Sequence, residues 1–564
     1  MKRIFSCLLS LIIILSCLPG AVLADTSAIF YDSITLLADD IASDSLGANS
    51  VDETSAVLSV RYDERYYVAL VDDIEINEVC EFENAVIDLC GHNVTANYPG
   101  GFALINSLII DSSGLGTFSI TSADAVKHYS PLSLNNSTAE NIIFKSSGSG
   151  AEKFRVINAT GNCTVNNCNF NISGIYDRVT AIYALDGSTL LSEGCLFAFD
   201  VDAYLPASVQ SYADFAVISG ASMSGRNMRQ EDEKTYFYGV VARVGECTVE
   251  NCNINLANYC TSGRSCGIYA TSECPLLTVA DCDIVADAHY LYADGGYKSL
   301  SIAIQSYAER CHIFYTTVRG AHSGVQLSGT ENYIVGSILE GTGHGGAYFC
   351  KNQKTGEDGN YLPVTSYVIN TTIAHIPAYG IFAGDASNPL YSSDNRAAFY
   401  IGGSSGANGI TVYMDGCTII GDKYSGVLRG SSSEYNNKLY MSNTSVGTPM
   451  RVDNDTMILG VGKSVSITPE SEFYWNRKGL TTYSKVDDSG VFFDETAVYC
   501  MPLQYDFNCD MMVNLKDVEY LLNSVLFLDG CHISSYMDVN FDGSKSIEDA
   551  EKFLYMVLFN DFVS

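Results

Sequence analysis

The stretch Asn251-Cys252-Asn253-Ile254 decides the fold, because its pattern returns along much of the chain. The pattern is a turn residue, a small residue, any residue and then an aliphatic residue or Phe. Its other copies begin at Asn167, Gly194, Asp281, Gly336, Asn370, Gly416 and Asn443. A second pattern, a small residue before a β-branched or apolar one, alternates with it, as in Gly267-Ile268. The spacing indicates a repeated coil of about 22 to 34 residues, doubled or interrupted in places.

Short strands at such a period, with scarcely any amphipathic helix between them, are typical of a parallel β-helix. One coil cannot bury its own apolar face, so coils stack and like residues form columns. We therefore predict a mainly β fold with a solenoid over residues 65–470. An N-terminal cap is expected at 25–64, and a C-terminal cap and linker at 471–500.

The start of this region carries a resemblance. Residues Ala85-Val-Ile-Asp88-Leu-Cys90-Gly-His92-Asn-Val94 resemble the turn that opens many bacterial β-helix domains. The resemblance implies a right-handed solenoid of the pectate-lyase-like superfamily. That superfamily shares an architecture, and an architecture does not determine chemistry.

The small position of the repeated pattern accounts for many of the 19 cysteines. It holds Cys168, Cys195, Cys252, Cys282 and Cys417 in some coils, and Thr316, Ser337, Thr371 and Thr444 in others. A position shared by Cys, Ser and Thr indicates a small interior site, so we predict buried reduced thiols, with disulfides as the alternative. Zinc binding is disfavoured, because pairs such as Cys163 and Cys168 lack the tight spacing of zinc knuckles.

The Asn or Asp before the small position has two interpretations. Its side chain can bond backbone groups of successive coils, which predicts an asparagine ladder. The alternative is a ligand site, and Asp281, Asp283 and Asp287 together suggest calcium binding as in pectate lyases.

Two copies of a calcium-loop pattern stand near the C-terminus, from Asp506 to Asp517 and from Asp538 to Asp549. The expected ligands occupy loop positions 1, 3, 5, 7, 9 and 12: Asp506, Asn508, Asp510, Met512, Asn514 and Asp517 in the first loop, and Asp538, Asn540, Asp542, Ser544, Ser546 and Asp549 in the second. Position 7 supplies its backbone carbonyl. The sequence therefore predicts two bound calcium ions.

One apolar helix is expected after each loop, at 518–528 and 550–559, with no equally clear helix before it. Such half EF-hands resemble a type I dockerin over residues 501–562. The resemblance implies docking onto a cohesin module of a scaffoldin in a cellulosome-like assembly. The alternatives are an acidic tail and an unrelated calcium module.

Docking is expected to occur through the second half-hand. Ile547, Tyr555 and Met556 are the apolar residues expected to face outward there, whereas the first half-hand offers the polar Asn523 and Ser524. Because desolvated aromatic and apolar anchors dominate interface energy, these three residues are predicted to bind the cohesin.

The N-terminus has the features of an export signal. Lys2-Arg3 precede an apolar run, and Ala21-Val-Leu-Ala24 has the form that signal peptidase cuts. We predict a signal peptide at 1–24 and a secreted, extracellular protein held at the cell surface by its cellulosome partner. A lipoprotein signal is the alternative, since Ile14-Leu-Ser-Cys17 loosely resembles a lipobox. No later segment is apolar and long enough to predict a membrane span.

Charge restricts the partners further. The chain has 31 Lys+Arg against 65 Asp+Glu, a formal net charge of −34. Such a surface disfavours nucleic acid and anionic membranes.

The candidate catalytic residues are two histidines. Gly343-His344-Gly345 resembles a tripeptide of polygalacturonases, but the other motifs of that family are absent from the matching places. In the coil register His344 falls beside His322, near Tyr348. Two such imidazoles can move a proton, or they can form a polar column of the scaffold.

These features favour a secreted cellulosome component whose β-helix acts on or binds plant cell-wall polysaccharide, either a polyuronide or a hemicellulose. An enzyme of this kind would be a polysaccharide lyase or a glycoside hydrolase. The alternatives are a non-catalytic carbohydrate-binding or adhesive solenoid and a structural spacer. With 37 Tyr and 1 Trp, the composition argues against a platform of tryptophans for crystalline cellulose.

Overall fold

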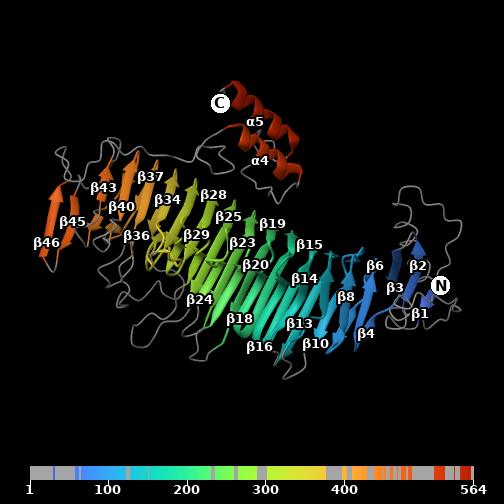
Figure 1. Ribbon diagram of the computed structural model, residues 1–564. Coiled ribbons are helices and arrows are strands. Elements are labelled where there is room, and N and C mark those ends of the chain that lie inside the picture. Colours follow the sequence, from blue (N-terminus) through green and yellow to red (C-terminus); the bar gives the residue numbers. More distant parts are fainter. Residues whose placement is uncertain are drawn as a thin grey trace. The chain divides into compact units, whose positions relative to one another are not determined.

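A computed structural model describes most of residues 65–452 (Figure 1). Within that span, the stretches left out are 122–127, 150–151, 230–234, 260–263, 289–300, 358, 377–396, 403–408, 423, 429–436 and 449. Beyond it, the structure describes residues 29–31, 57–62, 458–461, 466–467, 472–477, 480–485, 514–526, 539 and 546–559. The chain forms two compact units, one of residues 1–216, 220–229 and 235–240, the other of residues 217–219, 230–234 and 241–564.

The first unit is a stack of coils whose strands form parallel columns. The first column contains β3 (Arg65–Leu70), β6 (Ala85–Asp88), β9 (Leu108–Ile110), β12 (Thr138–Glu140), β15 (Asn162–Asn166) and β17 (Thr189–Glu193). The second contains β4 (Ile74–Ile76), β7 (Val94–Asn97), β10 (Thr117–Thr121), β13 (Ile143–Ser149), the first parts of β16 (Asn169–Ala184) and β18 (Leu196–Ser211), and β20 (Ser222–Asn227). The third contains β5 (Val79–Glu83), β8 (Gly101–Ile105), β11 (Leu132–Asn135), β14 (Phe154–Thr160) and the last parts of β16 and β18. At its start, β1 (Ile29–Tyr31), β2 (Val57–Tyr62) and β3 pair antiparallel.

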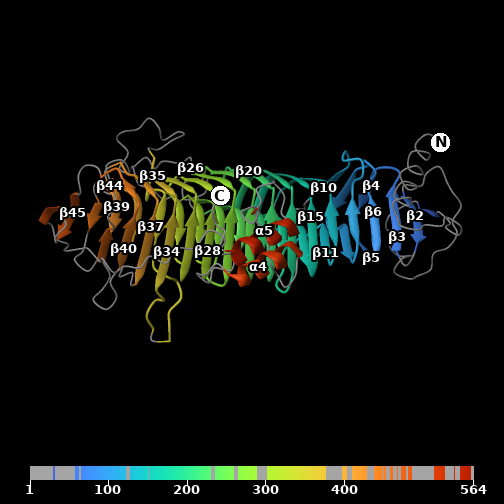
Figure 2. The same cartoon turned by 90° about the horizontal axis from the view of Figure 1, so that it is seen from above.

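The second unit repeats this plan (Figure 2). Its first column contains β22 (Glu246–Glu250), β25 (Leu276–Ala280), β28 (Arg310–Phe314), β31 (Glu331–Val335), β34 (Val364–Ile369), β37 (Ile410–Asp415), β40 (Lys438–Ser442) and β43 (Ile458–Val461). The second contains β23 (Asn253–Asn258), β26 (Asp283–Ala288), β29 (Thr317–Gly320), β32 (Ile338–Gly341), β35 (Thr372–His375), β38 (Thr418–Ile420), β41 (Ser445–Val446) and β44 (Ser466–Ile467). The third contains β24 (Arg264–Ala270), β27 (Ile302–Ser306), β30 (Ser323–Leu327), β33 (Ala347–Phe349), β36 (Ala397–Ile401), β39 (Tyr424–Leu428), β42 (Met450–Val452) and β45 (Glu472–Arg477).

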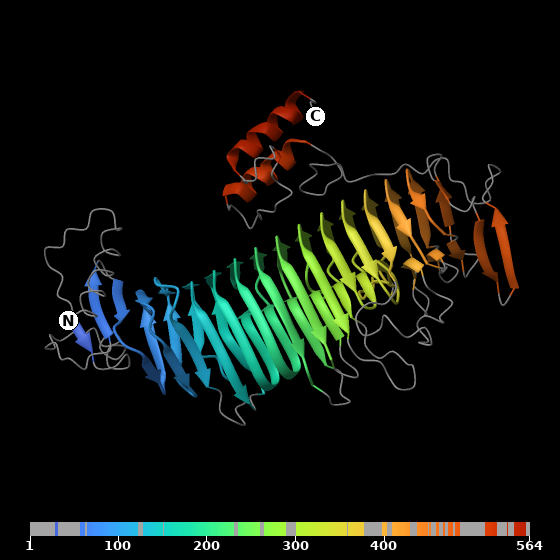
Figure 3. The same cartoon turned by 180° about the vertical axis from the view of Figure 1, so that it is seen from behind.

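Two strands, β19 (Phe215–Ser219) and β21 (Tyr236–Ala242), contain residues of both units. The last pairing is antiparallel, between β45 and β46 (Leu480–Lys485). Figure 3 shows the parallel arrows of successive coils from behind. The predicted solenoid of parallel strands is thus confirmed as a mainly β structure, consistent with a β-helix.

Stacked coils bury their apolar residues in rows. Phe144, Phe170 and Phe197 stand in register on neighbouring coils, and adjacent ring centroids lie 4.9 Å apart. All three side chains are buried. Because each ring packs on the ring of the next coil, the row supplies the apolar burial that no single coil provides.

The turn residue of the repeated pattern is the corner between the first and second columns. Its φ is 50° at Asn167, 52° at Asn251, 51° at Asp281 and 61° at Gly416. Asn, Asp and Gly tolerate this left-handed conformation best. The backbone N–H also donates to the following coil at five of these corners, as from Asn167 to the carbonyl of Glu193 (2.8 Å); the others are Asn251, Asp281, Gly336 and Asn370. The corner residues therefore form a ladder through their backbone.

The small position after the corner needs a hydrogen-bond donor. Cys282 Sγ donates to the carbonyl of Ala280 (3.1 Å), and Thr316 Oγ1 donates to that of Phe314 (2.8 Å). The backbone N–H of Thr316 in turn donates to Ser337 Oγ of the next coil (3.2 Å). Cys, Ser and Thr exchange at this position because each is small and each can donate to a carbonyl that also accepts a backbone N–H, as that of Ala280 does from Asn251.

The cysteines of the described residues are all free, and all of them except Cys90 are buried. Burial raises the pKa of Cys311 and of Cys417 to about 12. The prediction of buried reduced thiols is confirmed for this part of the chain.

Near the C-terminus, the structure describes two helices, α4 (Leu515–Leu526) and α5 (Ile547–Phe559) (Figure 1). Both begin earlier than the predicted 518 and 550, because each helix starts inside the calcium-loop pattern. Their buried core consists of Val518, Leu521, Val539, Ala550, Phe553 and Met556. In the described part of the chain, no helix has the length and apolar character needed to cross a membrane.

Candidate functional site

The predicted calcium ligands are only partly described. Asn514, Asp517, Ser546 and Asp549 lie in the described residues. The remaining predicted ligands lie outside them: Asp506, Asn508, Asp510, Met512, Asp538, Asn540, Asp542 and Ser544. The site is therefore built from the last part of each loop.

The starts of α4 and α5 have the same geometry. The backbone N–H of Asn514 donates to Asp517 Oδ2 (2.9 Å), and that of Ser546 donates to Asp549 Oδ2 (2.7 Å). The side-chain oxygens of Asn514 and Ser546 accept the backbone N–H two residues later. These reciprocal bonds are a capping box at the start of each helix.

A capping box alone does not require the carboxylate to be buried. Asp517 and Asp549 are both 0% exposed, and Asp549 Oδ1 also accepts the backbone N–H of Val539 (2.8 Å). Burial of a carboxylate is costly without compensating partners, and a bound cation is such a partner. The donor set of Asp, Asn and Ser oxygens fits a hard cation such as calcium.

The predicted cohesin-binding residues differ in how exposed they are in the structure. Ile547 is 50% exposed and Tyr555 is 55% exposed. Met556 is only 8% exposed and belongs to the core between α4 and α5, so its expected outward position is wrong. Met556 lies on the inner side because it follows Phe553 by three residues on the helix. Leu554 and Leu558 are also exposed on α5, and their exposure was not predicted from the sequence.

His322 and His344 are brought together, as the coil register predicts. Their ring centroids lie 4.2 Å apart, and the backbone N–H of His344 donates to the carbonyl of His322 (2.7 Å). The His344 ring also contacts Tyr400 (4.8 Å) and Tyr348 (5.1 Å). Tyr379, which the sequence places nearby, lies outside the described residues.

The electrostatics of His322 do not favour proton transfer near neutral pH. Burial holds the pKa of His322 well below its usual range, and the neighbouring His344 and Arg264 lower it further. A general acid works best with a pKa near the working pH. The nearby carboxylate of Glu340 accepts a hydrogen bond from Arg319 Nε (2.7 Å). The cluster is therefore a largely buried group of polar and aromatic side chains, and it is poorly suited to act as an acid–base pair.

A row of tyrosines on the first column of the second unit was not predicted. Tyr333, Tyr367, Tyr413 and Tyr440 stack on neighbouring coils, with centroids 5.0, 5.2 and 5.1 Å apart. Their faces pack on one another, so the row does not offer flat faces to sugar rings. The signal was a Tyr at the same place in successive coils, as in Ser366-Tyr367-Val368.

The third column of the second unit has a different outward row. Tyr269, Gln305, Gln326, Tyr348 and Tyr400 stand in register along it. The amides bond to a neighbouring phenol, as from Gln305 Nε2 to the hydroxyl of Tyr307 (2.7 Å). Gln305 (8% exposed) and Tyr400 (3% exposed) are buried, whereas Tyr269, Gln326 and Tyr348 are partly exposed. These three side chains can offer hydrogen bonds and aromatic carbon to a hydroxyl-rich ligand.

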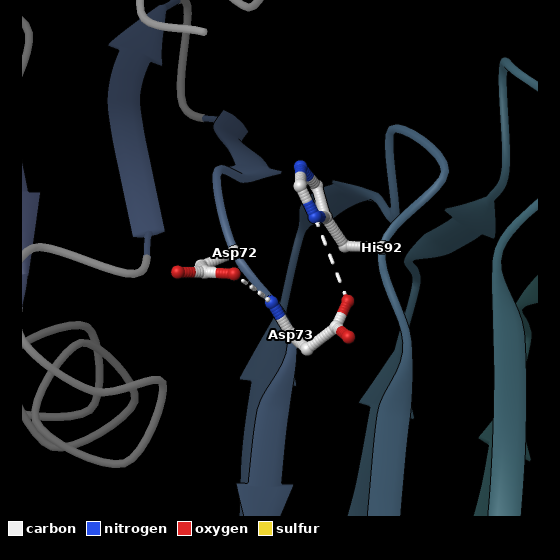
Figure 4. Close-up of side chains that lie close together, drawn as sticks. All are labelled: Asp72, Asp73 and His92. Atoms are coloured by element: carbon white, nitrogen blue, oxygen red, sulfur yellow. Dashed lines mark hydrogen bonds and ion pairs between the residues drawn. The ribbon is translucent and has the colours of Figure 1, made fainter.

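One group of possible metal ligands is present among the described residues. Ligand atoms of Asp72, Asp73 and His92 lie within 4.8 Å of one another, and His92 Nδ1 lies 3.6 Å from Asp73 Oδ1 (Figure 4). Asp73 also accepts hydrogen bonds from the backbone N–H and the side chain of Asn93. These bonds lower the pKa of Asp73 and tie two coil turns together. The predicted set Asp281, Asp283 and Asp287 does not form such a group in the described residues.

No family model matches the chain, and comparisons with curated proteins and with solved structures find no match either.

Proposed function

We propose that this chain is a secreted component of a cellulosome-like assembly, with a dockerin at residues 501–562 and a right-handed β-helix that binds plant cell-wall polysaccharide. The observation that carries the proposal is the matched pair of helix starts, Asn514 with Asp517 and Ser546 with Asp549. Two loops with the same ligand pattern, each ending in a buried carboxylate, are what a duplicated calcium-binding half-hand requires.

Calcium would be held by the predicted ligands of both loops. When bound, it supplies a positive charge that compensates the buried carboxylates of Asp517 and Asp549. The residues themselves cap the two helices and so connect ion binding to the helix pair. Docking onto a cohesin would then depend on calcium.

The docking surface is proposed on α5. Leu554 and Leu558 lie one turn apart on the helix, and Tyr555 stands beside them. All three are exposed, whereas the adjacent Phe553 and Met556 are buried. Exposed apolar and aromatic side chains around one helix face are typical anchors of a protein interface. The partner is therefore a cohesin that binds mainly the second half-hand.

The solenoid is proposed to bind polysaccharide and not to cleave it. The outward row of amides and phenols on the third column supports binding. The neutral state of buried His322 and the pairing of Glu340 with Arg319 do not support an acid and base that converge on a glycosidic bond.

Isothermal titration calorimetry of the full chain tests docking first, against cohesin modules from the same source organism with calcium and with excess chelator. Binding only with calcium is expected. The same protein is then incubated with xylans, glucans and pectins while reducing ends and ultraviolet absorbance are followed. Binding without product release is the expected result. Release of unsaturated or reducing products would replace the binding function with a lyase or hydrolase.

A further inference from the structure

Two short motifs, each containing a tyrosine, follow one another on neighbouring coils, and this pair of motifs occurs once in each compact unit. Ile182-Tyr183-Ala184 is followed one coil later by Gln210-Ser211-Tyr212-Ala213 in the first unit. Ile268-Tyr269-Ala270 is followed by Gln305-Ser306-Tyr307-Ala308 in the second. Both pairs stand on the third column, so the structure places the same residue types at equivalent positions of two separate units.

In the first unit, the pair builds a compact polar and aromatic group. Tyr183 is in register with Gln210, and Gln210 Nε2 donates to the Tyr212 hydroxyl (3.4 Å). The rings of Tyr183 and Tyr212 have centroids 5.5 Å apart. The guanidinium carbon of Arg155 lies 3.4 Å from the centroid of the Tyr183 ring. Arg155, Tyr183, Gln210 and Tyr212 thus form one constellation.

The second unit repeats the two tyrosines and the glutamine, but its arginine comes from a different place. Arg155 is in register with Thr180, before Tyr183, whereas Arg243 follows Ala242, whose carbonyl accepts the N–H of Thr271, after Tyr269. Tyr269 is in register with Gln305, whose Nε2 donates to the Tyr307 hydroxyl (2.7 Å). The rings of Tyr269 and Tyr307 have centroids 5.9 Å apart, and the Arg243 guanidinium carbon lies 5.8 Å from the Tyr269 centroid. The backbone repeats as well, since Tyr212 and Tyr307 each donate their N–H to the Ala that follows the first Tyr (2.9 Å in both).

The repeated tyrosines stand on the outer side of the coils, and the glutamines beside them are largely covered, with Gln210 9% and Gln305 8% exposed. The residues on either side of the first tyrosines, Ile182 with Ala184 and Ile268 with Ala270, are buried and fill the interior. The tyrosines alternate with them, so they face outward and keep part of their surface exposed. Outward positions accept many polar residues without loss of the fold. The same Tyr, Gln and Tyr in both units, each with an arginine near the first ring, indicate a shared use of the outer surface.

The chemistry of the group fits a sugar. The amide donates to the phenol oxygen, which leaves the phenol O–H of Tyr212 or Tyr307 to donate to a ligand. Burial raises the pKa of Tyr307, so its hydroxyl stays protonated. Amides, phenols and guanidinium groups bond to hydroxyls, while tyrosine rings contact the apolar side of a sugar.

The net charge of the chain favours neutral sugars over anionic sugars as ligands. A formal net charge of −34 repels a polyanionic chain such as a polyuronide. Each constellation has one arginine near an aromatic ring, and in the second unit Arg264 also lies close enough to act on Tyr307. A neutral glycan carries no such repulsion.

We propose that each unit carries one binding site for a neutral glycan, formed by Arg155, Tyr183, Gln210 and Tyr212 in the first and by Arg243, Tyr269, Gln305 and Tyr307 in the second. This inference rests on the proposed polysaccharide binding by the solenoid. It adds the ligand class, the residues and the number of sites.

Calorimetry of the full chain with soluble xylan and glucan oligosaccharides tests the inference, with oligogalacturonate as the charged comparison. The wild-type protein is expected to bind two neutral ligands per chain. In Y212F or Y307F, half of the sites should weaken about fivefold, and in the double variant both should, since each substitution removes one hydroxyl donor. Tyr413→Phe, in the stacked row of the first column, is the matched control, and its affinity should equal that of the wild type.

The outcomes separate this inference from the function on which it rests. If a neutral glycan binds the double variant as tightly as the wild type and circular dichroism is unchanged, the two proposed sites are wrong. Polysaccharide binding by the solenoid would then still stand. Preference for oligogalacturonate would overturn the ligand class. If no glycan binds the wild-type chain, the proposed polysaccharide binding fails together with the two sites.

Discussion

The backbone N–H of Thr316 donates to the hydroxyl of Ser337 in the next coil, at 3.2 Å. The Thr316 hydroxyl itself donates within its own coil, to the carbonyl of Phe314. The side chain after the corner therefore serves both its own coil and a neighbouring coil. This double role makes the position sensitive to chemistry as well as to size.

Replacement of Cys282 tests that role. Cys282→Ser should be nearly neutral, because a hydroxyl can also donate to the carbonyl of Ala280. Cys282→Ala removes this bond but leaves the carbonyl of Ala280 its donor from the backbone N–H of Asn251 (3.0 Å), so it should cost about 1 kcal/mol. The overpacked Cys282→Leu should cost about 1 to 3 kcal/mol. Urea unfolding of the three variants provides the measurement. An Ala variant as stable as the Ser variant would show that size alone matters.

The buried thiols should be inert in the native protein. Burial raises the pKa of Cys311 and Cys417 to about 12, so very little of these two thiols is thiolate at pH 8. A hydrogen bond with Cys168 lowers the pKa of Cys195, but that thiol is fully buried and closed to reagent. Among the described cysteines, only the partly exposed Cys90 should react with iodoacetamide before unfolding. Peptide mass spectrometry of native and urea-unfolded samples locates the label. Rapid native labelling of Cys282, or its recovery in a disulfide with Cys252, would contradict the buried-thiol state.

Removal of calcium should unfold the helix pair and leave the solenoid intact. A ligand that binds only the folded form stabilises it by about 2.7 kcal/mol per site at a hundredfold excess over Kd. Chelator should therefore abolish the α-helical circular dichroism signal while the β signal persists. Asp549→Ala should mimic this effect, and Asp214→Ala, an exposed acid of the first unit, is the control. A helical signal that chelator leaves unchanged would refute the calcium-dependent fold.

Substitutions on α5 should separate docking from folding. Tyr555→Ala should weaken cohesin binding by about 2 kcal/mol, because Tyr555 is an exposed aromatic residue. Met556→Ala should instead destabilise the helix pair by about 2 to 5 kcal/mol, because Met556 fills its core. Calorimetry with cohesin and thermal unfolding distinguish the two effects. If Met556→Ala lowers the affinity for cohesin without lowering stability, Met556 contacts the cohesin after all.

Buried histidines should make the second unit sensitive to acid. Burial lowers the pKa of His312 to about 3, with a smaller effect of Arg310, against an ordinary value of about 6.5. Between these values the unfolded chain binds a proton that the folded chain does not. Stability is therefore complete above about pH 6.5 and falls as the pH drops toward 3, by about 1.4 kcal/mol per unit for this residue.

His312→Phe checks this contribution, because the aromatic ring can still pack beside Tyr333. The variant should lose less stability than the wild type between pH 6.5 and 4.5 in urea unfolding. Parallel pH profiles of the two proteins would show that His312 titrates alike in the folded and unfolded chains.

The repeat that begins at Asn251 was enough to predict stacked coils of parallel strands. The corner needs a residue that tolerates positive φ, and the next position needs a small donor, so both requirements are visible as residue types at fixed places. The neighbouring placement of His322 and His344 followed from the same coil register. These features depend on local backbone geometry and on a period, and a linear sequence records both.

The tertiary structure decided which face each side chain uses. Met556 turned inward because α5 packs against α4, and a helix of mixed apolar residues does not reveal which side its partner covers. The tyrosines at 333, 367, 413 and 440 became a stacked row because variable insertions still bring them into register. The paired constellations around Gln210 and Gln305 also depend on contacts between coils. By itself, the sequence determined the period and the conformation of each corner, and only the folded chain determined which distant residues share a surface, because coil-to-coil register and helix packing are long-range properties.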